Sequence, residues 1–478
     1  MKIRFGLALA FLIGLTTAGC AGGGGGAATS SATPAAGAGG VALQAGERPR
    51  ENAETRAAER AIDQAGEAED EAQAEALYQE AFTNAEAAMT ADERNPLAHL
   101  LAGRALMGLN RYAEASAHLD RAEELRPLYQ FDIQRERETA WMNLYQEAVP
   151  FVNSGDYEAA AEVFESANAI YDQRPEVMIM LGQIYAQLRE HDKSIENLDR
   201  AMAVAADEEI LATVDSATAA SWQEQVADIP MTRASVLADA GRFEEAVSGF
   251  ADLVAADPDN VVFTRNLAAL LIQADQNDSA VVVLDGLMTR SDLSAQDYYT
   301  VGIGYYQTSA YERAAQAFAG AAERNVNDRD ALEMWARSLQ IDSIYDAVPA
   351  VADRWIALDP NSQTAHIIYA QAANQMGNTQ VAADMIGRVE AMKVIVTDLQ
   401  ITRRSTGGAT VSGSLRNGSG APGSQTTLAF TFYDEAGTAM GSANVAVTLP
   451  ATDMSEIFRV DFDSADQVGG YGYTVSGM

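Results

Sequence analysis

The sequence predicts a helical repeat array followed by a small all-β domain. Apolar residues recur at the three-and-four spacing of amphipathic helices through most of residues 97–390. After Glu390 the spacing changes to an alternation of period two, as at Phe430 and Phe432. A chain of 478 residues is also too long for one compact core, which favours an extended array.

The run 295–322 shows one repeat unit most clearly. Val301, Gly302 and Tyr305 share one face of a first helix, and Phe318 lies on the matching face of a second. A small residue at Gly302 should allow the two helices to approach closely. This order of small and aromatic residues resembles the tetratricopeptide (TPR) repeat, in which each helix pair buries its free faces against its neighbours.

The resemblance implies a TPR-like α-solenoid of about eight helix pairs over residues 51–391. Residues 51–93 read as a degenerate first pair, and Asn95-Pro96 supplies an N-cap and a first-turn proline for the next helix. An insert near 207–226 interrupts the pattern, and we expect it to hold one extra helix around Trp222.

Residues 392–478 have the sequence of a small β-sandwich, with roughly six or seven short strands separated by glycine-containing turns. The segment 430–434, Phe-Thr-Phe-Tyr-Asp, resembles the signature of the FxLYD domain, with Phe432 where the family has Leu. The flanking segments 411–417 and 434–437 fit that family too. This resemblance implies a location in the cell envelope rather than a mechanism. The change of period near Glu390 predicts a domain boundary.

The first twenty residues resemble a lipoprotein signal peptide. Lys2 and Arg4 precede an apolar stretch, and Thr-Ala-Gly leads to Cys20, the sole cysteine. Thr17 departs from the usual Leu of the lipobox. The resemblance implies a diacylglycerol on the Cys20 thiol, and Ala21 implies forwarding to the outer membrane. An ordinary secretory signal that contains a cysteine is the alternative.

Residues 21–50 are rich in Gly, Ala, Ser and Thr and predict a flexible linker after the signal peptide 1–20. The formal charge of the chain is −36 and falls almost entirely on the middle of the sequence. Nucleic acid is therefore excluded as an expected partner.

We expect no catalytic or metal chemistry. The four histidines, His99, His118, His191 and His366, show no ligand or catalytic spacing, and we expect no two of them to be neighbours on one helix face. The acidic run 67–71 lacks the glycine of a calcium loop and is typical of a solvated helix. The sequence therefore predicts no enzyme, no metal, no cofactor and no small-molecule substrate.

What remains is a surface for proteins. First-helix residues that avoid the packing pattern should line a groove that suits an extended peptide or a partner helix. The predicted groove residues are Ile179, Gln183, Met231, Ser235, Arg265, Ile272, Tyr299, Ile303, Tyr306 and Arg337. For each of them, a place in the core between repeats is the alternative. A groove that clamps a terminal carboxylate would need lysine and asparagine clusters, and this chain lacks them.

The functional hypothesis is a non-catalytic scaffold of the cell envelope, anchored by lipid at Cys20 and facing the periplasm from the outer membrane. Its groove would bind other envelope proteins or peptides. Two alternatives stay open: a periplasmic chaperone-like holder of secreted or outer-membrane polypeptides, and an accessory subunit of an envelope export complex.

Overall fold

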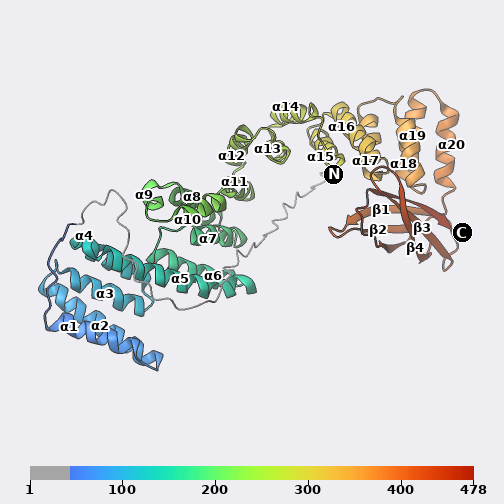
Figure 1. Cartoon of the computed structure of the whole chain (residues 1–478). Coiled ribbons are helices and arrows are strands. Elements are labelled where there is room, and N and C mark those ends of the chain that lie inside the picture. The colour runs from blue at the N-terminus through green and yellow to red at the C-terminus, as the bar shows by residue number, and fades with distance from the viewer. Residues whose placement is uncertain (1–43, 478) are drawn as a thin grey trace.

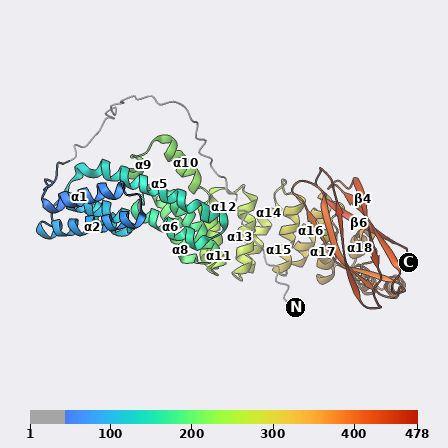
Figure 2. The ribbon, with the colours of Figure 1, turned by 90° about the horizontal axis from the view of Figure 1, so that it is seen from below.

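The computed structural model describes residues 44–477, so the predicted signal peptide, Cys20 and most of the linker lie outside the described residues. Helices pair into an elongated solenoid, with a β-sandwich docked at its C-terminal end (Figures 1 and 2). This confirms the predicted fold class, an α-solenoid followed by an all-β domain. The described part of the chain forms nine helix pairs, close to the number expected.

The first helices of the pairs are α1 (Ala53–Gly66), α3 (Pro96–Gly108), α5 (Gln130–Ser154), α7 (Pro175–Gln187), α11 (Ile229–Asp239), α13 (Val261–Gln273), α15 (Ala295–Gln307), α17 (Arg329–Ile341) and α19 (Gln363–Gln375). The second helices are α2 (Glu71–Ala91), α4 (Tyr112–Leu125), α6 (Tyr157–Ile170), α8 (His191–Ala206), α12 (Phe243–Ala256), α14 (Asn277–Met288), α16 (Tyr311–Arg324), α18 (Val348–Leu358) and α20 (Thr379–Glu390). In the described part of the chain, no helix is both long and apolar enough to cross a membrane.

The helices of a pair approach closely because a small residue faces a large one. A Cβ atom added at Gly302 would lie 2.7 Å from the Phe318 ring, and one added at Gly182 would lie 2.6 Å from Leu198. Tyr305 and Phe318 are fully buried beside this contact. The predicted close approach at Gly302 is therefore confirmed.

The expected insert is present between α8 and α11. It consists of the short helix α9 (Glu208–Leu211) and α10 (Ser216–Val226), which packs against α7 and α8. Trp222 is buried, and its indole N–H donates to Glu176 at 2.9 Å. The Arg174 guanidinium lies over the rings of both Trp141 and Trp222. The insert thus packs on the fourth helix pair, and Arg174 links it to Trp141 of the third.

The C-terminal domain is a sandwich of two three-stranded antiparallel sheets. One sheet has the order β1-β2-β5 and the other β4-β3-β6. The strands are β1 (Val394–Arg403), β2 (Ala409–Asn417), β3 (Gln425–Tyr433), β4 (Ala439–Thr448), β5 (Ser455–Phe462) and β6 (Gly470–Ser476). Alternate residues of β3, including Phe430 and Phe432, are buried against aromatic side chains such as Phe458 and Tyr473. The period-two pattern therefore predicted the buried face correctly.

Residues 44–50 run along the first repeats instead of standing clear of them. The Glu47 N–H donates to the Leu125 carbonyl at 2.7 Å, and the Asn95 amide exchanges hydrogen bonds with the Arg50 backbone. Gly46, at φ +62°, fits against the backbone of Leu125, where no side chain has room. This end of the predicted linker is therefore ordered by the solenoid.

Candidate functional site

Among the first helices, α1 contacts α3, α13 contacts α15 and α17 contacts α19. We call the side of the solenoid that the first helices form the inner wall. All ten predicted groove residues lie on first helices, from α7 to α17. Gln183 is exposed, and Ile179, Met231 and Ile272 are half-buried. Ser235 is buried, and its hydroxyl donates to the Met231 carbonyl of its own helix at 3.0 Å. It therefore lies within the wall and offers no surface to a ligand.

The aromatic part of the predicted groove lies on α15. Tyr299 packs edge-to-face on the buried Phe318, with ring centroids 5.5 Å apart. Tyr306 packs edge-to-face on Tyr311 at 5.3 Å, and Ile303 lies half-buried between the two tyrosines in sequence. Burial raises the pKa of both tyrosines above the usual value. Both rings are thus half-buried, each packed against one aromatic neighbour.

Tyr299 is the more deeply packed of the two. Burial and the neighbouring Asp330, Asp328 and Glu333 carboxylates raise its pKa further than burial alone would. Tyr299 therefore belongs more to the core than to the groove, while Tyr306 keeps more of its ring free.

The arginines of the wall are neutralised by carboxylates. Arg265 pairs with Asp297 of the next repeat at 3.1 Å, and Arg337 pairs with Glu333 one turn away at 2.7 Å. These partly exposed pairs contribute little to stability. They leave the wall without an uncommitted positive charge at these two predicted positions, which disfavours a ligand recognised by its carboxylate.

Sequence reasoning missed two exposed isoleucines on the same wall. Ile341 at the end of α17 is 45% exposed and Ile367 on α19 is 36% exposed. Gln340 of α17 bonds to Gln371 of α19 beside them. Ile367 lies two repeats of about 34 residues after Tyr299, so the repeat register carried the signal that could have found it.

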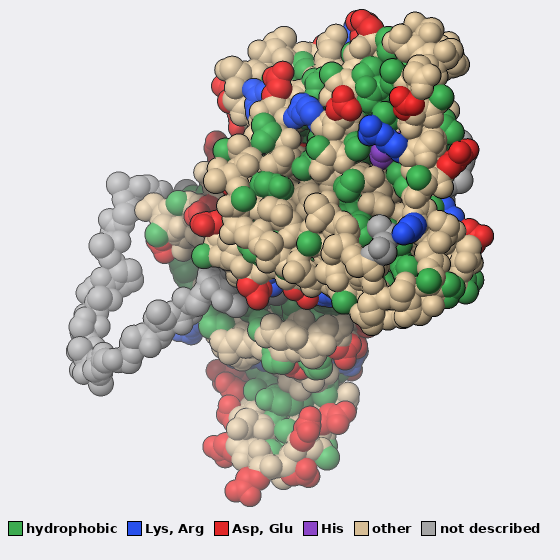
Figure 3. All heavy atoms as spheres, turned by 90° about the vertical axis from the view of Figure 1, so that its right-hand side faces the viewer, with side chains coloured by type: hydrophobic (Ala, Val, Ile, Leu, Met, Phe, Trp, Pro, Cys, Tyr) green, Lys and Arg blue, Asp and Glu red, His purple; other side chains and the backbone are tan. Residues whose placement is uncertain are grey.

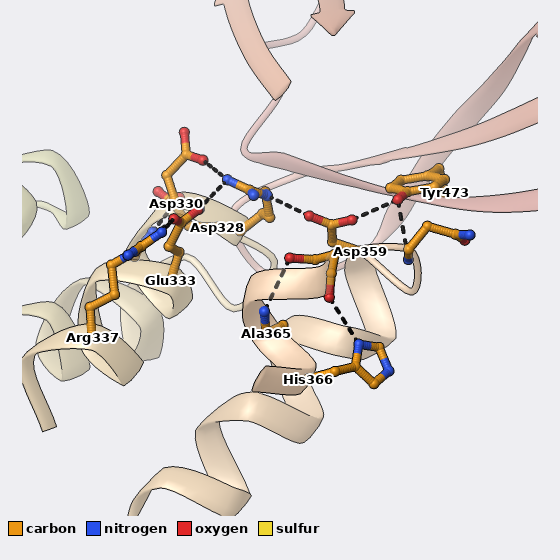
Figure 4. Close-up of polar contacts among 12 residues, drawn as sticks. Asp328, Asp330, Glu333, Arg337, Asp359, Ala365, His366 and Tyr473 are labelled. Atoms are coloured by element: carbon orange, nitrogen blue, oxygen red, sulfur yellow. Dashed lines mark hydrogen bonds and ion pairs between the residues drawn. The ribbon is translucent and has the colours of Figure 1, made fainter. Parts of the chain in front are cut away.

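A second site lies where the sandwich meets the solenoid (Figure 4). Asp359, in the loop after α18, is 1% exposed and accepts hydrogen bonds from Tyr473 of β6 at 2.6 Å and from Arg329 of α17 at 3.0 Å. Arg329 also contacts Glu333 at 2.7 Å. Burial raises the pKa of Asp359, and the Arg329 guanidinium and the Tyr473 hydroxyl oppose that rise.

Backbone contacts extend this docking. The Asn325 amide donates to the Gly469 carbonyl at 2.8 Å, and the Val326 N–H donates to the Glu435 carbonyl at 3.3 Å. A Cβ atom at Gly470 would collide with the Asn327 backbone at 2.1 Å. Glycine therefore lets β6 approach the loop before α17, and the sandwich is joined to the last repeats by buried polar bonds.

One histidine contact was not expected from the sequence. His99 of α3 and His118 of α4 lie in contact, with their Nδ1 atoms 3.2 Å apart, although no two histidines share one helix face. The expectation considered only single helices, and this contact joins two helices of one pair. His99 Nε2 also contacts the Glu93 carbonyl at 3.0 Å, and His366 Nδ1 contacts the Ser362 carbonyl at 2.9 Å.

No metal-binding group accompanies these contacts in the described part of the chain. Within residues 44–477, no group of three or more His, Cys, Asp or Glu side chains is placed to hold a metal ion. Near the sandwich, the buried Asp359 is bonded to Tyr473 and to Arg329, and these bonds hold two parts of the chain together.

A model of the tetratricopeptide-repeat family matches residues 152–214 and 237–296. These two segments therefore resemble TPR repeats. Among solved structures, a crystal structure of MamA is 18% identical and covers 33% of this chain and 91% of its own, with a TM-score of 0.28. YrrB, described as a TPR protein with an unusual peptide-binding site, is 14% identical over 34% of this chain and 83% of its own, with a TM-score of 0.29. No curated protein matches the chain.

Proposed function

We propose that this TPR protein is a non-catalytic scaffold that binds an extended peptide or a helix of a protein partner on its inner wall. The observation that carries the proposal is the set of apolar side chains that the first helices of the C-terminal half leave partly or largely exposed, namely Ile303 and Tyr306 on α15, Ile341 on α17 and Ile367 on α19. Half-exposed aromatic and aliphatic side chains on a rigid wall are the anchors that protein interfaces use.

The charges on the inner wall restrict the kinds of peptide that it is expected to bind. Because Arg265 and Arg337 are paired with carboxylates, a partner gains little from an acidic terminus. The chain as a whole carries −36, so a neutral or basic segment should approach fastest. The proposed ligand is therefore an apolar segment flanked by neutral or basic residues.

We further propose that the scaffold is lipid-anchored in the cell envelope through Cys20 and faces the periplasm from the outer membrane. The lipobox-like Thr-Ala-Gly-Cys20 and the FxLYD-like segment 430–434 support this location. Anchoring would raise the local concentration of the wall for membrane partners. Labelling cells with an alkyne fatty acid should mark the native chain and spare Cys20→Ala. Equal labelling of both would refute the anchor while leaving the binding wall untouched.

The binding proposal is tested by placing a photoreactive phenylalanine at Tyr306 and, as a control, at Val282. Val282 is 70% exposed but lies on α14, a second helix outside the inner wall. We expect protein adducts at position 306 and none at position 282. One abundant partner supports the scaffold, and many weak clients favour the chaperone-like holder. Adducts that are equal at both positions would contradict the inner wall as the site.

A further inference from the structure

The last helix pair ends the solenoid with an uncovered apolar face. A shallow depression of about 500 Å³ lies along α19 and α20, and its lining combines small and apolar side chains with the polar Gln371, Asn374, Thr379 and Glu390. The residues that line it are Ala370, Gln371, Asn374, Thr379, Ala382, Ala383, Ile386, Gly387 and Glu390. Ile386 stands in the middle of this strip on α20 and is 40% exposed. Figure 3 looks onto this end of the molecule.

An earlier repeat shows what such a face packs against. Ala315 and Ala322 of α16 lie two repeats of about 34 residues before Ala383 and Glu390 of α20. Both alanines are buried, in one cluster with Leu332 of the following helix α17. On α20 the same positions are exposed, because the chain turns into the sandwich, which docks beside α17 and α18. The face of α20 therefore stands where α16 packs against the next helix pair, with Glu390 in place of the buried Ala322.

The charges at the two ends of the solenoid indicate which helix would cover this face of α20. Residues 51–91 at the other end hold eleven acidic and two basic residues. Residues 363–390 hold only Asp384, Arg388 and Glu390 as charged residues. A head-to-tail stack would bring the apolar strip against the acidic first pair, whereas a tail-to-tail contact brings two nearly neutral surfaces together.

We propose that the α20 face binds a second copy of this chain in a two-fold, antiparallel contact of α20 with α20. The strip is complementary to itself in one register of that contact. Ile386 of each copy then faces Ala383 of the other, so a large side chain meets a small one, while Ala382 faces Gly387, where two small residues allow a close approach.

The residues at the two ends of the strip, Thr379 and Glu390, are also compatible with this register. Thr379 faces Glu390 of the other copy, which places a hydroxyl donor beside a carboxylate acceptor. The two Glu390 residues lie about 16 Å apart along the helices at 1.5 Å per residue. That separation exceeds the screening length of about 8–10 Å at physiological salt, so their mutual repulsion is small.

The register is tested with two single variants, Ala382→Cys and Gly387→Cys, in the full chain carrying Cys20→Ser. The two variants bear different affinity tags and are expressed together. We expect a disulfide-linked mixed dimer in at least about tenfold excess over the dimer that either variant forms alone, because like positions lie too far apart to be bridged. Equal amounts of disulfide-linked dimer in the co-expressed sample and in the two single-variant samples would overturn the proposal. The absence of linked dimer from all three would also overturn it.

The contact itself is tested by sedimentation of the full chain in non-ionic detergent. Ile386→Arg should convert the dimer to a monomer. The matched variant Val381→Arg changes a residue that is 36% exposed on the opposite side of the same helix, and it should leave the dimer intact. A monomeric parent chain, or a strip that links to a different protein instead of a second copy, would overturn the proposal. The binding of a partner at Tyr306 is a separate result and would survive either outcome.

Discussion

At the scale of single residues, the structure separates glycines that the packing needs from glycines that it tolerates. Gly302 faces the Phe318 ring so closely that an added Cβ would lie 2.7 Å from it. Gly286 of α14 is also helical, but an added Cβ there meets nothing within 4 Å. The two positions should therefore respond to the same substitution with opposite signs.

We predict that Gly302→Ala lowers the free energy of unfolding by about 1–3 kcal/mol, the usual cost of overpacking a core. Gly286→Ala should raise it by about 0.5–1 kcal/mol, because alanine is the better helix former. Urea unfolding followed by circular dichroism measures both. A neutral Gly302→Ala would mean that the helix pair can separate at little cost, contrary to the packing seen here.

The His99–His118 contact predicts a pH dependence. Burial and the neighbouring His99 ring lower the pKa of His118. Arg111 lowers it further, and the Glu114 and Glu86 carboxylates offset only part of this decrease. Because the unfolded chain then binds protons more readily, this contribution to stability is complete above about pH 6.5 and is lost as the pH falls through the lowered pKa.

We therefore expect the melting temperature of the parent chain to fall between pH 7 and pH 5 more steeply than that of His118→Gln. Glutamine keeps a polar side chain near His99 but does not titrate. Both proteins share the carboxylates of the rest of the chain, so the difference between their slopes isolates the histidine. Parallel slopes would show that His118 titrates as it does in the unfolded chain.

At the scale of elements, the sequence predicted what depends on neighbours along the chain and missed what depends on contacts between elements. The helix pairs, the insert around Trp222 and the strands follow from local periodicity, and the structure confirms them. The contacts of His99 with His118 and of Asp359 with Tyr473 join different elements, and no periodic pattern encodes them. The same limit applies to Ser235, whose repeat position predicted a groove while its actual neighbours bury it.

The two tyrosines of β6 provide a test of the sandwich docking. The Tyr473 hydroxyl donates to the buried Asp359 carboxylate, whereas the buried Tyr471 hydroxyl has no hydrogen-bond partner among the described residues. We predict that Tyr473→Phe lowers the free energy of unfolding by about 1.5–3 kcal/mol, the range for a hydrogen bond to a charged group. Tyr471→Phe should leave it unchanged or raise it slightly. Equal effects in thermal unfolding of the two variants would argue against a structural role for the Asp359 bond.

At the scale of the whole molecule, the two ends of the solenoid differ in charge and in what packs against them. The first pair carries a dense acidic surface, and residues 44–50 lie along its neighbours. The last pairs hold the sandwich at the loops around Asn325 and Asp359, and the face of α20 stays open. In a solenoid each repeat contacts only its neighbours, so a change at one end should be felt locally.

That locality gives a prediction for the chain shortened to end at residue 391. Without the sandwich, Asp359 loses Tyr473 and Asn325 loses Gly469, while the contacts within α1 to α8 are unchanged. We expect amide hydrogen exchange to speed up in α17 to α20 and to stay within error in α1 to α8, because repeats open in local units. The full chain with Ile457→Ser, at a strand residue that is 81% exposed, serves as the control for a change that leaves the docking intact. Faster exchange along the entire solenoid would show that the repeats unfold as one unit and that the sandwich stabilises all of them.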